Sequence, residues 1–166
     1  WRNSLCLVGR FWVLEAIVAW VVLLPLLFAL QKTNVTLGYV AVLGFLVWTF
    51  GFVVEAVADM QKFRFTQNSK NKGKWIQEGL WSWSRHPNYF GEITVWVGMY
   101  ITLFVSLTDL ERLLGLVSPL AIAGTLIFAS GIPILEKSAD KKWGSNPAYK
   151  EYKKRTSILI LRPPRG

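Results

Sequence analysis

The chain has 166 residues, of which 52% are hydrophobic and nine are tryptophan, and its formal net charge is +9. This length favours one domain, and the four long apolar runs indicate a membrane domain rather than a soluble globule. A secretory signal peptide does not explain them, because its single apolar core is short and these runs recur along the chain. Cys6 is the only cysteine, which excludes an internal disulfide and a thiolate metal cluster.

The apolar runs predict transmembrane helices. A hydrocarbon core about 30 Å thick needs roughly 20 helical residues to cross it. We therefore predict an all-α, multi-pass transmembrane helical bundle with about four spans, near residues 11–30, 37–58, 91–108 and 113–135. We treat residues 1–166 as a single membrane domain. Because the chain does not begin with Met, we expect it to be processed, trimmed or missing its true N-terminus, with missing N-terminal spans as one alternative.

Basic residues gather on one face of the predicted bundle. Residues 59–90 carry six Lys and Arg side chains and residues 136–166 carry nine, whereas the opposite face holds only Lys32 and Arg112. The positive-inside rule puts this basic loop and tail on the cytoplasmic side. Attraction to anionic lipid headgroups and binding of a polyanionic ligand both explain the charge. We expect no nucleic-acid partner, because a basic surface beside membrane helices has the simpler explanation.

The stretch "SRHPNYFGE", residues 84–92, places polar chemistry directly before the third predicted span. Pro87 interrupts any helix there and biases the preceding residue toward an extended conformation. The first turn of the following helix carries unpaired N–H groups, which suit a phosphate or carboxylate. The candidate binding residues of this stretch are Arg85, His86, Asn88, Tyr89 and Glu92.

Two acidic residues form another candidate pair. Glu55 and Asp59 are four residues apart, so they share one helical face at the membrane edge, where two like charges repel each other. His86 is the only histidine, so we expect no zinc site. Trp75 and Trp81 are explained by the aromatic belt of a membrane interface.

The tail predicts two short helices. Glu136, Asp140 and Trp143 follow the last span at helical spacing, and Gly144 is a helix stop. Pro147 opens a second helix that carries two tyrosines and several cations: Tyr149, Lys150, Tyr152, Lys153, Lys154 and Arg155. A C-terminal interfacial amphipathic helix has this composition, and so does a lid over a charged ligand.

Three motifs carry a resemblance: "EAVADMQKFRF", "SRHPNYFGE" and "LEKSADKKWGSNPAYKEYKKRTSILI". In this order they resemble the uncharacterised multi-pass proteins grouped with the steroid 5-alpha-reductases, over about residues 50–161. More distantly, the sterol C14 and C7 reductases and the isoprenylcysteine carboxyl methyltransferases share the architecture.

The resemblance implies a membrane enzyme with a cytoplasm-facing cofactor pocket in its C-terminal half. In the reductases NADPH donates hydride to a carbon–carbon double bond of a steroid, a sterol or another lipid-soluble enone. Asn88 and Glu92 match the residues that hold the cofactor, and Asp59 matches a third acidic position. The tail motif implies nucleotide contacts from Glu136, Asp140 and Tyr152, and phosphate contacts from Lys137, Lys154 and Arg155. No Gly-x-Gly-x-x-Gly sequence is present, so a Rossmann site is not expected.

Two departures from the reductase pattern leave alternatives open. The residues that polarise the enone are not matched, and Glu15 and Glu55 are the only acids inside the first two spans, which makes Glu55 the candidate catalytic residue. The tripeptide "RHP" also occurs in the methyltransferases, whose pocket binds S-adenosylmethionine and whose substrate is a lipid or a prenylated thiol. A non-catalytic subunit of a larger membrane assembly is a further alternative. A small transporter is disfavoured, because the polar residues gather at one membrane face.

Overall fold

The computed structural model of the chain describes residues 12–13, 16–33 and 38–164, and in these ranges the regular elements are all helical. The longer helices are α2 (Leu24–Leu30), α3 (Tyr39–Gln67), α4 (Pro87–Leu103), α5 (Asp109–Gly115), α6 (Val117–Gly124), α7 (Ile132–Trp143) and α8 (Pro147–Arg155). Short helical turns are η1 (Ser69–Asn71), η2 (Gly79–Ser82), η3 (Phe104–Ser106) and the π-helical η4 (Thr125–Ala129). The predicted all-α bundle is confirmed.

Three helical segments of the described residues are long and apolar enough to cross a membrane: Tyr39–Gln67, Pro87–Ser106 and Asp109–Trp143. They correspond to the second, third and fourth predicted spans. The first predicted span begins outside the described residues, and Glu15 also lies outside them. Its described end is the seven-residue α2, in which Pro25 occupies the first turn. The count of four spans is therefore approximate.

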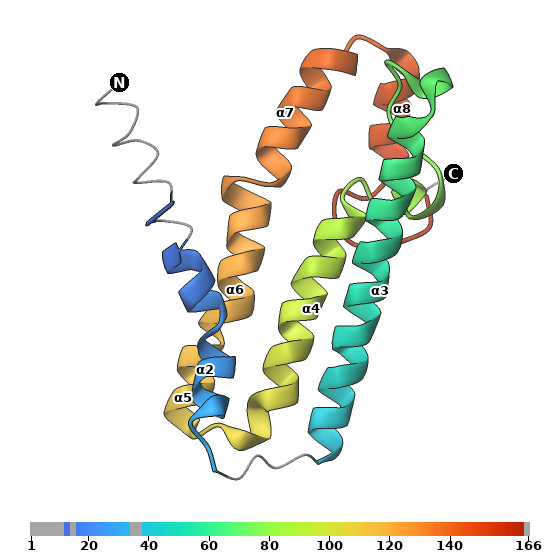
Figure 1. The fold of residues 1–166 in the computed structure, drawn as a ribbon. Coiled ribbons are helices and arrows are strands. Elements are labelled where there is room, and N and C mark those ends of the chain that lie inside the picture. Colours follow the sequence, from blue (N-terminus) through green and yellow to red (C-terminus); the bar gives the residue numbers. More distant parts are fainter. Residues whose placement is uncertain (1–11, 14–15, 34–37, 165–166) are drawn as a thin grey trace, which may run out of the picture.

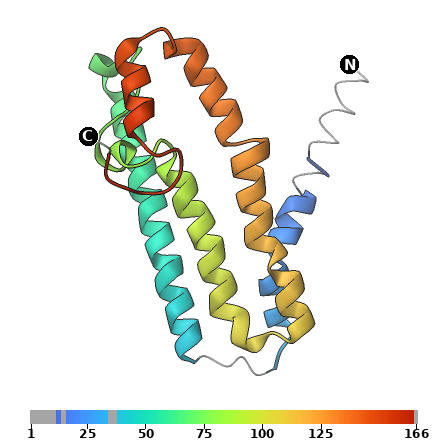
Figure 2. The same ribbon diagram turned by 180° about the vertical axis from the view of Figure 1, so that it is seen from behind.

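Helices α3 and α4 run side by side in opposite directions (Figures 1 and 2). Glycines let their backbones touch: a Cβ built on Gly51 meets the backbone nitrogen of Val95 at 2.6 Å, and one built on Gly91 meets that of Glu55 at 2.6 Å. Gly44 faces Thr102 and Gly98 faces Trp48 in the same way. Small residues are the usual means of close packing between membrane helices, where lipid removes the hydrophobic drive.

Helices α5, α6 and α7 form one long, broken rod beside this pair (Figure 1). The rod changes direction after α6, where the backbone follows π-helical η4 and then Gly131, which is not helical (φ −90°, ψ −99°). Pro133 follows in the first turn of α7, and its backbone nitrogen has no hydrogen to donate to the helical hydrogen bonds. This break aims α7 toward the basic end of the bundle.

The opposite end of the bundle pairs its few charges locally. Lys32 Nζ lies 2.7 Å from Glu111 Oε1, and Arg112 Nη1 lies 2.7 Å from Asp109 Oδ1. The residues "DLER", which lie between the third and fourth predicted spans, are helical and begin α5. Thr108 caps this helix in a capping box with Glu111, and the turn between the spans lies at residues 104–108.

The basic loop and tail meet at the other end, where α3 ends, α4 begins and α7 and α8 lie (Figures 1 and 2). Here α3 continues to Gln67, so residues 59–67 are helical and were wrongly assigned to the loop. No Gly or Pro follows Gly51 before Asn68 ends the helix. The two tail helices are confirmed as α7, which ends at Gly144, and α8, which begins at Pro147.

Candidate functional site

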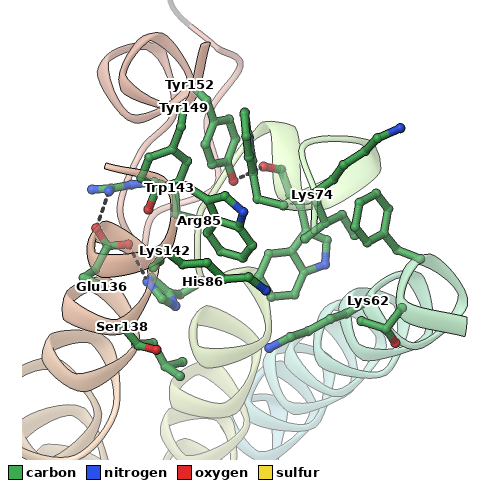
Figure 3. A pocket seen from close by; sticks show the side chains of 17 residues that line it. Lys62, Lys74, Arg85, His86, Glu136, Ser138, Lys142, Trp143, Tyr149 and Tyr152 are labelled. Atoms are coloured by element: carbon green, nitrogen blue, oxygen red, sulfur yellow. Dashed lines mark hydrogen bonds and ion pairs between the residues drawn. The ribbon is translucent and has the colours of Figure 1, made fainter. Parts of the chain in front are cut away.

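A cavity of about 330 Å³ opens at the basic end of the bundle (Figure 3). Its lining comes from the end of α3, from the segment between α3 and α4, from α7 and from α8. Binding sites for small molecules span about 300 to 1,000 Å³ and concentrate apolar walls with a few placed polar groups. The cavity is therefore large enough for a nucleoside-sized group.

Six aromatic side chains line the cavity. They belong to Phe65, Trp75, Trp81, Trp143, Tyr149 and Tyr152. Trp75 packs edge-on against Tyr149 and Trp143, with ring centroids 5.2 and 6.1 Å apart. Tyr149 and Tyr152 are 3% and 5% exposed, so the aromatic face of α8 is turned into the protein.

Hydrogen bonds from these rings to backbone carbonyls fix the walls in place. Trp81 Nε1 donates to the carbonyl of Ala58 on α3 (2.9 Å), and the Tyr152 hydroxyl donates to the carbonyl of Trp81 (2.8 Å). Trp143 Nε1 donates to the carbonyl of Gly73 (2.6 Å). Burial raises the pKa of Tyr152, so it remains a neutral donor at physiological pH. The rings thus connect α7 and α8 to the loop and to α3.

The C-terminal segment is attached directly to the start of α4. Ser84 and Ser157 form an isolated parallel bridge, in which the backbone N–H of Arg85 donates to the carbonyl of Ser157 (2.8 Å). Fully buried Ser84 donates from its hydroxyl to the carbonyl of Leu159 (2.8 Å) and accepts from the N–H of His86 (3.1 Å). This contact holds Arg85 and His86 at the cavity.

Glu136 is the acid at the centre of the site. Its carboxylate accepts a hydrogen bond from Arg85 Nη1, lies 3.0 Å from His86 Nε2 and lies 3.0 Å from Lys153 Nζ. Because a carboxylate only accepts hydrogen bonds, the contact with His86 requires a hydrogen on Nε2. Figure 3 shows the contacts with Arg85 and His86. Glu136 thereby links the start of α4 to α7 and α8.

Lys153 joins a second acid to this group, because its Nζ also lies 2.6 Å from Asp140 Oδ1. Burial alone would lower the pKa of Lys153, but hydrogen bonds to Asp140 and Glu136 raise it above its ordinary value. Lys153 is therefore a permanent cation at neutral pH. Its ion pairs with Glu136 and Asp140 join α8 to α7.

Cations outnumber acids on the cavity lining. The lining includes one acid, Glu136, and four cations: Lys62, Lys74, Arg85 and Lys142. Lys62 lies over the ring of Trp81 (5.1 Å to the centroid), and Lys142 lies over that of Trp143 (4.5 Å). Within the described part of the chain, Arg85 Nε and Trp75 Nε1 are buried and have no hydrogen-bond partner. The cavity lining therefore carries excess positive charge, which suits an anionic ligand.

The family described as "Protein of unknown function (DUF1295)" matches residues 1–156. The chain belongs to this family. DUF1295 is part of the steroid 5-alpha-reductase-like superfamily, so the resemblance in the three motifs is confirmed at the level of the superfamily. The chain is thus a membrane protein from a superfamily of reductases and methyltransferases.

A curated relative named "Probable O-methyltransferase ustE", from Ustilaginoidea virens, is 42% identical over 53 residues. The match covers 32% of this chain and 18% of that protein. The match to this DUF1295 chain therefore covers less than a fifth of the length of that relative. No solved structure matches the chain.

The cavity of this DUF1295 protein brings together four of the predicted binding residues: Arg85, His86, Glu136 and Tyr152. Asp140 lies one helical turn beyond Glu136 and is bound to Lys153. Arg155 is exposed and donates to Gln77 Oε1 (3.3 Å). Lys137 and Lys154 are exposed and lie outside the cavity lining.

Four further candidates form a separate group between α3 and α4, outside the cavity lining. Glu55 and Glu92 interact electrostatically with Asp59, and Tyr89 interacts with Glu92. Tyr89 also stacks on His86, with centroids 5.6 Å apart and planes 9° apart, which connects the two groups. Asn88 is half-buried in the first turn of α4 and is not part of the cavity lining.

Several lining residues were not predicted, above all Trp75, Trp81, Trp143 and Tyr149. The aromatic belt explained the tryptophans without a site, so composition gave no reason to select them. One signal could have found two of them. Trp143 and Tyr149 lie in the same tail motif as Glu136 and Tyr152, which were already candidates. Among the described residues, no group of three or more His, Cys, Asp or Glu side chains is arranged to hold a metal ion.

Proposed function

We propose that this protein is a membrane-embedded, NADPH-dependent reductase of a carbon–carbon double bond in a lipid-soluble steroid-, sterol- or enone-like substrate. The observation that carries the proposal is the cationic, aromatic lining of the cavity. Lys62, Lys74, Arg85 and Lys142 line it, and its one acid, Glu136, is already paired. The superfamily to which DUF1295 belongs supports the class of enzyme.

Charge favours NADPH over S-adenosylmethionine. NADPH carries a pyrophosphate and a further phosphate, whereas S-adenosylmethionine carries no phosphate and bears a positive sulfonium. Hydrogen bonds from Arg and Lys to phosphate oxygens are about twice as strong as neutral ones. Four cations around one cavity would repel a cationic ligand and attract a polyanion.

The aromatic walls suit the flat rings of such a cofactor. Stacking of a base on an aromatic side chain contributes about 1–3 kcal/mol. Trp75, Trp81 and Tyr149 line the cavity with their rings. The described residues therefore fit the cofactor in both charge and ring surface.

NADPH, when bound, supplies the hydride. The chain's own residues bind and orient: Arg85 and the lining lysines meet phosphates, and His86 and Glu136 hold Arg85 in place. A lipid-soluble acceptor would enter from the bilayer between the helices. Two further assignments are predictions. Asn88 and Glu92 contact the nicotinamide end, and Glu55 holds a proton for the acceptor.

A second candidate is an S-adenosylmethionine-dependent methyltransferase that acts on a lipid or a prenylated thiol. The observation in its favour is the match to the relative named as a probable O-methyltransferase. A cavity of about 330 Å³ also accommodates a cofactor with a single nucleoside.

Equilibrium binding of NADPH and S-adenosylmethionine to the detergent-purified chain tests both candidates. We expect saturable NADPH binding that weakens about tenfold in Lys142→Ala, since one charge-assisted contact to phosphate contributes about 1.5–3 kcal/mol. Lys141→Ala is the matched control, because Lys141 is exposed on the same helix and is not part of the lining. Binding of S-adenosylmethionine alone would replace reduction by methyl transfer, and binding of neither would remove the enzyme assignment.

A further inference from the structure

The C-terminal segment, residues 157–162, lies beside the start of α4 (Figures 1 and 2). Besides the bridge between Ser84 and Ser157, the backbone N–H of Arg162 donates to the carbonyl of Trp83 (3.5 Å). The side chains of the segment alternate between two environments. Those that are buried or half-buried are Ser157, Leu159 and Leu161, and those that are exposed are Ile158 (45%) and Ile160 (64%). The two isoleucines form what we call the outer face of the segment.

This segment lies at the level where the bundle leaves the hydrocarbon of the membrane. Its partner Ser84 shortly precedes the membrane-spanning segment Pro87–Ser106. On the neighbouring helix the same level is marked by Ala58, whose carbonyl accepts from Trp81, and the next residue of α3 is the charged Asp59. These contacts put the outer face near the depth of the lipid headgroups.

The charge around the outer face is entirely positive along the sequence. Lys154 and Arg155 precede the segment and Arg162 ends it, and all three side chains are exposed. No acid occurs in residues 152–166. Trp83, beside the segment, is 44% exposed, and tryptophan is enriched at the membrane interface. Exposed apolar side chains between cations complement an anionic lipid surface.

Helix α8 does not offer such an apolar face. Its tyrosines, Tyr149 and Tyr152, are buried in the wall of the cavity. Its exposed side chains are small or polar: Pro147, Ala148, Lys150, Glu151, Lys154 and Arg155. The apolar contact with a membrane surface therefore falls to the segment after α8.

We propose that residues 158–162 form an interfacial anchor, in which Ile158 and Ile160 insert among the headgroups of an anionic leaflet. The flanking cations contact the charges of these headgroups: Lys154, Arg155 and Arg162. This inference does not depend on the reductase function. It bears on the cavity all the same, because the bridge from Ser157 holds Arg85 and His86 there. Lipid at the anchor supports the site from outside.

The test places one fluorescent label on the segment in the full chain. Cys6 is the only cysteine, so Cys6→Ser gives a background in which Ile160→Cys carries the sole nitrobenzoxadiazole label. The chain is reconstituted in vesicles of phosphatidylcholine and phosphatidylserine in equal parts, with the acyl chains brominated close to the headgroup. Bromine quenches a label only on contact. Ile158→Cys is a second site on the same face, in case the first variant does not fold.

Two further positions calibrate the quenching. Leu46 is 59% exposed on the membrane-spanning α3, so a label at Leu46→Cys should be quenched. Ser69 is exposed in η1, beyond the end of α3, so a label at Ser69→Cys should stay unquenched. We expect the label on the outer face to lose about as much fluorescence as the label on α3.

Bromine on only one of the two lipids measures the preference for charge. Each cation near an anionic surface favours the charged lipid about fivefold. Brominated phosphatidylserine should therefore quench the label at residue 160 more strongly than brominated phosphatidylcholine, and high salt should reduce the difference. Lys154→Gln combined with Arg162→Gln should reduce it too. Lys70→Gln is the matched control, because Lys70 is exposed in η1, away from the segment.

Three results would overturn the proposal. Quenching no stronger than at Ser69→Cys would place the segment in water. Emission shifted to the blue without quenching would mean that protein covers the outer face, either a second copy of the chain or another partner. Equal quenching by the two brominated lipids would remove the preference for an anionic leaflet.

Discussion

Glu136→Gln is the substitution that most directly examines how the site holds together. The carboxylate binds Arg85 and His86, which precede α4, and Lys153 on α8, so its partners come from two different parts of the chain. Glutamine preserves the shape of the side chain but removes its charge, and its NH₂ group is a donor that cannot accept from Arg85. The variant therefore leaves the Arg85 guanidinium without its counter-charge.

The cost follows from burial. Removing one partner of a fully buried ion pair costs about 3–5 kcal/mol. The Arg85 and Glu136 side chains are 12% and 17% exposed, so solvent screens the remaining charge only in part. We expect a loss of about 2–3 kcal/mol in the free energy of unfolding. For a chain of this size each kcal/mol lowers the melting temperature by about 2–4 °C, which gives a decrease of roughly 5–10 °C.

Thermal unfolding of the detergent-purified protein, followed by tryptophan fluorescence, measures this decrease. Glu151→Gln is the matched control, because Glu151 is exposed on α8 and its loss should change the melting temperature by about 1 °C or less. A double-mutant cycle with Arg85→Met then isolates the pair. Coupled residues show interaction energies of about 0.5–3 kcal/mol, so the double variant should lose less than the sum of the two single variants.

Two results would refute this reasoning. One is a Glu136→Gln variant that melts together with the Glu151→Gln control, and the other is strict additivity in the cycle with Arg85→Met. Either would mean that Glu136 does not hold α4, α7 and α8 together. The cavity walls would then depend on the aromatic contacts, the Lys153–Asp140 ion pair and the Ser84–Ser157 bridge.

Three further predictions concern packing, binding and pH. Gly51→Ala should lower the melting temperature by separating α3 from α4, at a cost of about 1–3 kcal/mol, whereas Gly124→Ala, which faces open space, should be neutral or slightly stabilising. Asn88→Ala should weaken NADPH binding if Asn88 has the cofactor-binding role that the reductase motif implies, and unchanged affinity would remove Asn88 from the site. Because the pKa of Lys153 is raised in the folded protein, its ion pairs should contribute fully to stability below about pH 10 and lose this contribution at higher pH. Lys153→Met should therefore reduce the loss of stability on alkaline titration. Lys154→Met, at an exposed neighbouring residue, should not.

Much of the helical framework could be predicted from local sequence. Pro87 and Pro147 begin α4 and α8, and Gly144 ends α7, because proline fits only the first turn of a helix and glycine favours its end. The end of α3 was missed because hydropathy falls at Ala58 while helix propensity continues to Gln67. Hydropathy measures the lipid-facing length, and a helix can extend beyond it into water.

The site was predicted only in part, for a geometric reason. Residues 84–86 precede α4 and turn toward α7 and the tail, whereas Glu92, inside α4, faces Asp59 on α3. Closeness in the motif "SRHPNYFGE" therefore does not mean closeness in space. Which residues share a cavity depends on the Ser84–Ser157 bridge and on the Glu136 contacts, and neither long-range pairing has a signature in one sequence.

The bridge between Ser84 and Ser157 also bears on how the protein matures. The three membrane-spanning segments of the described residues end by Trp143, so the chain completes them before it reaches Ser157. The basic end of the bundle can therefore close only after the last of these segments has been synthesised. A chain cut between Trp143 and Ser157 would keep all three segments but lose the bridge that holds Arg85 and His86 at the cavity, so truncation there would separate membrane insertion from assembly of the site.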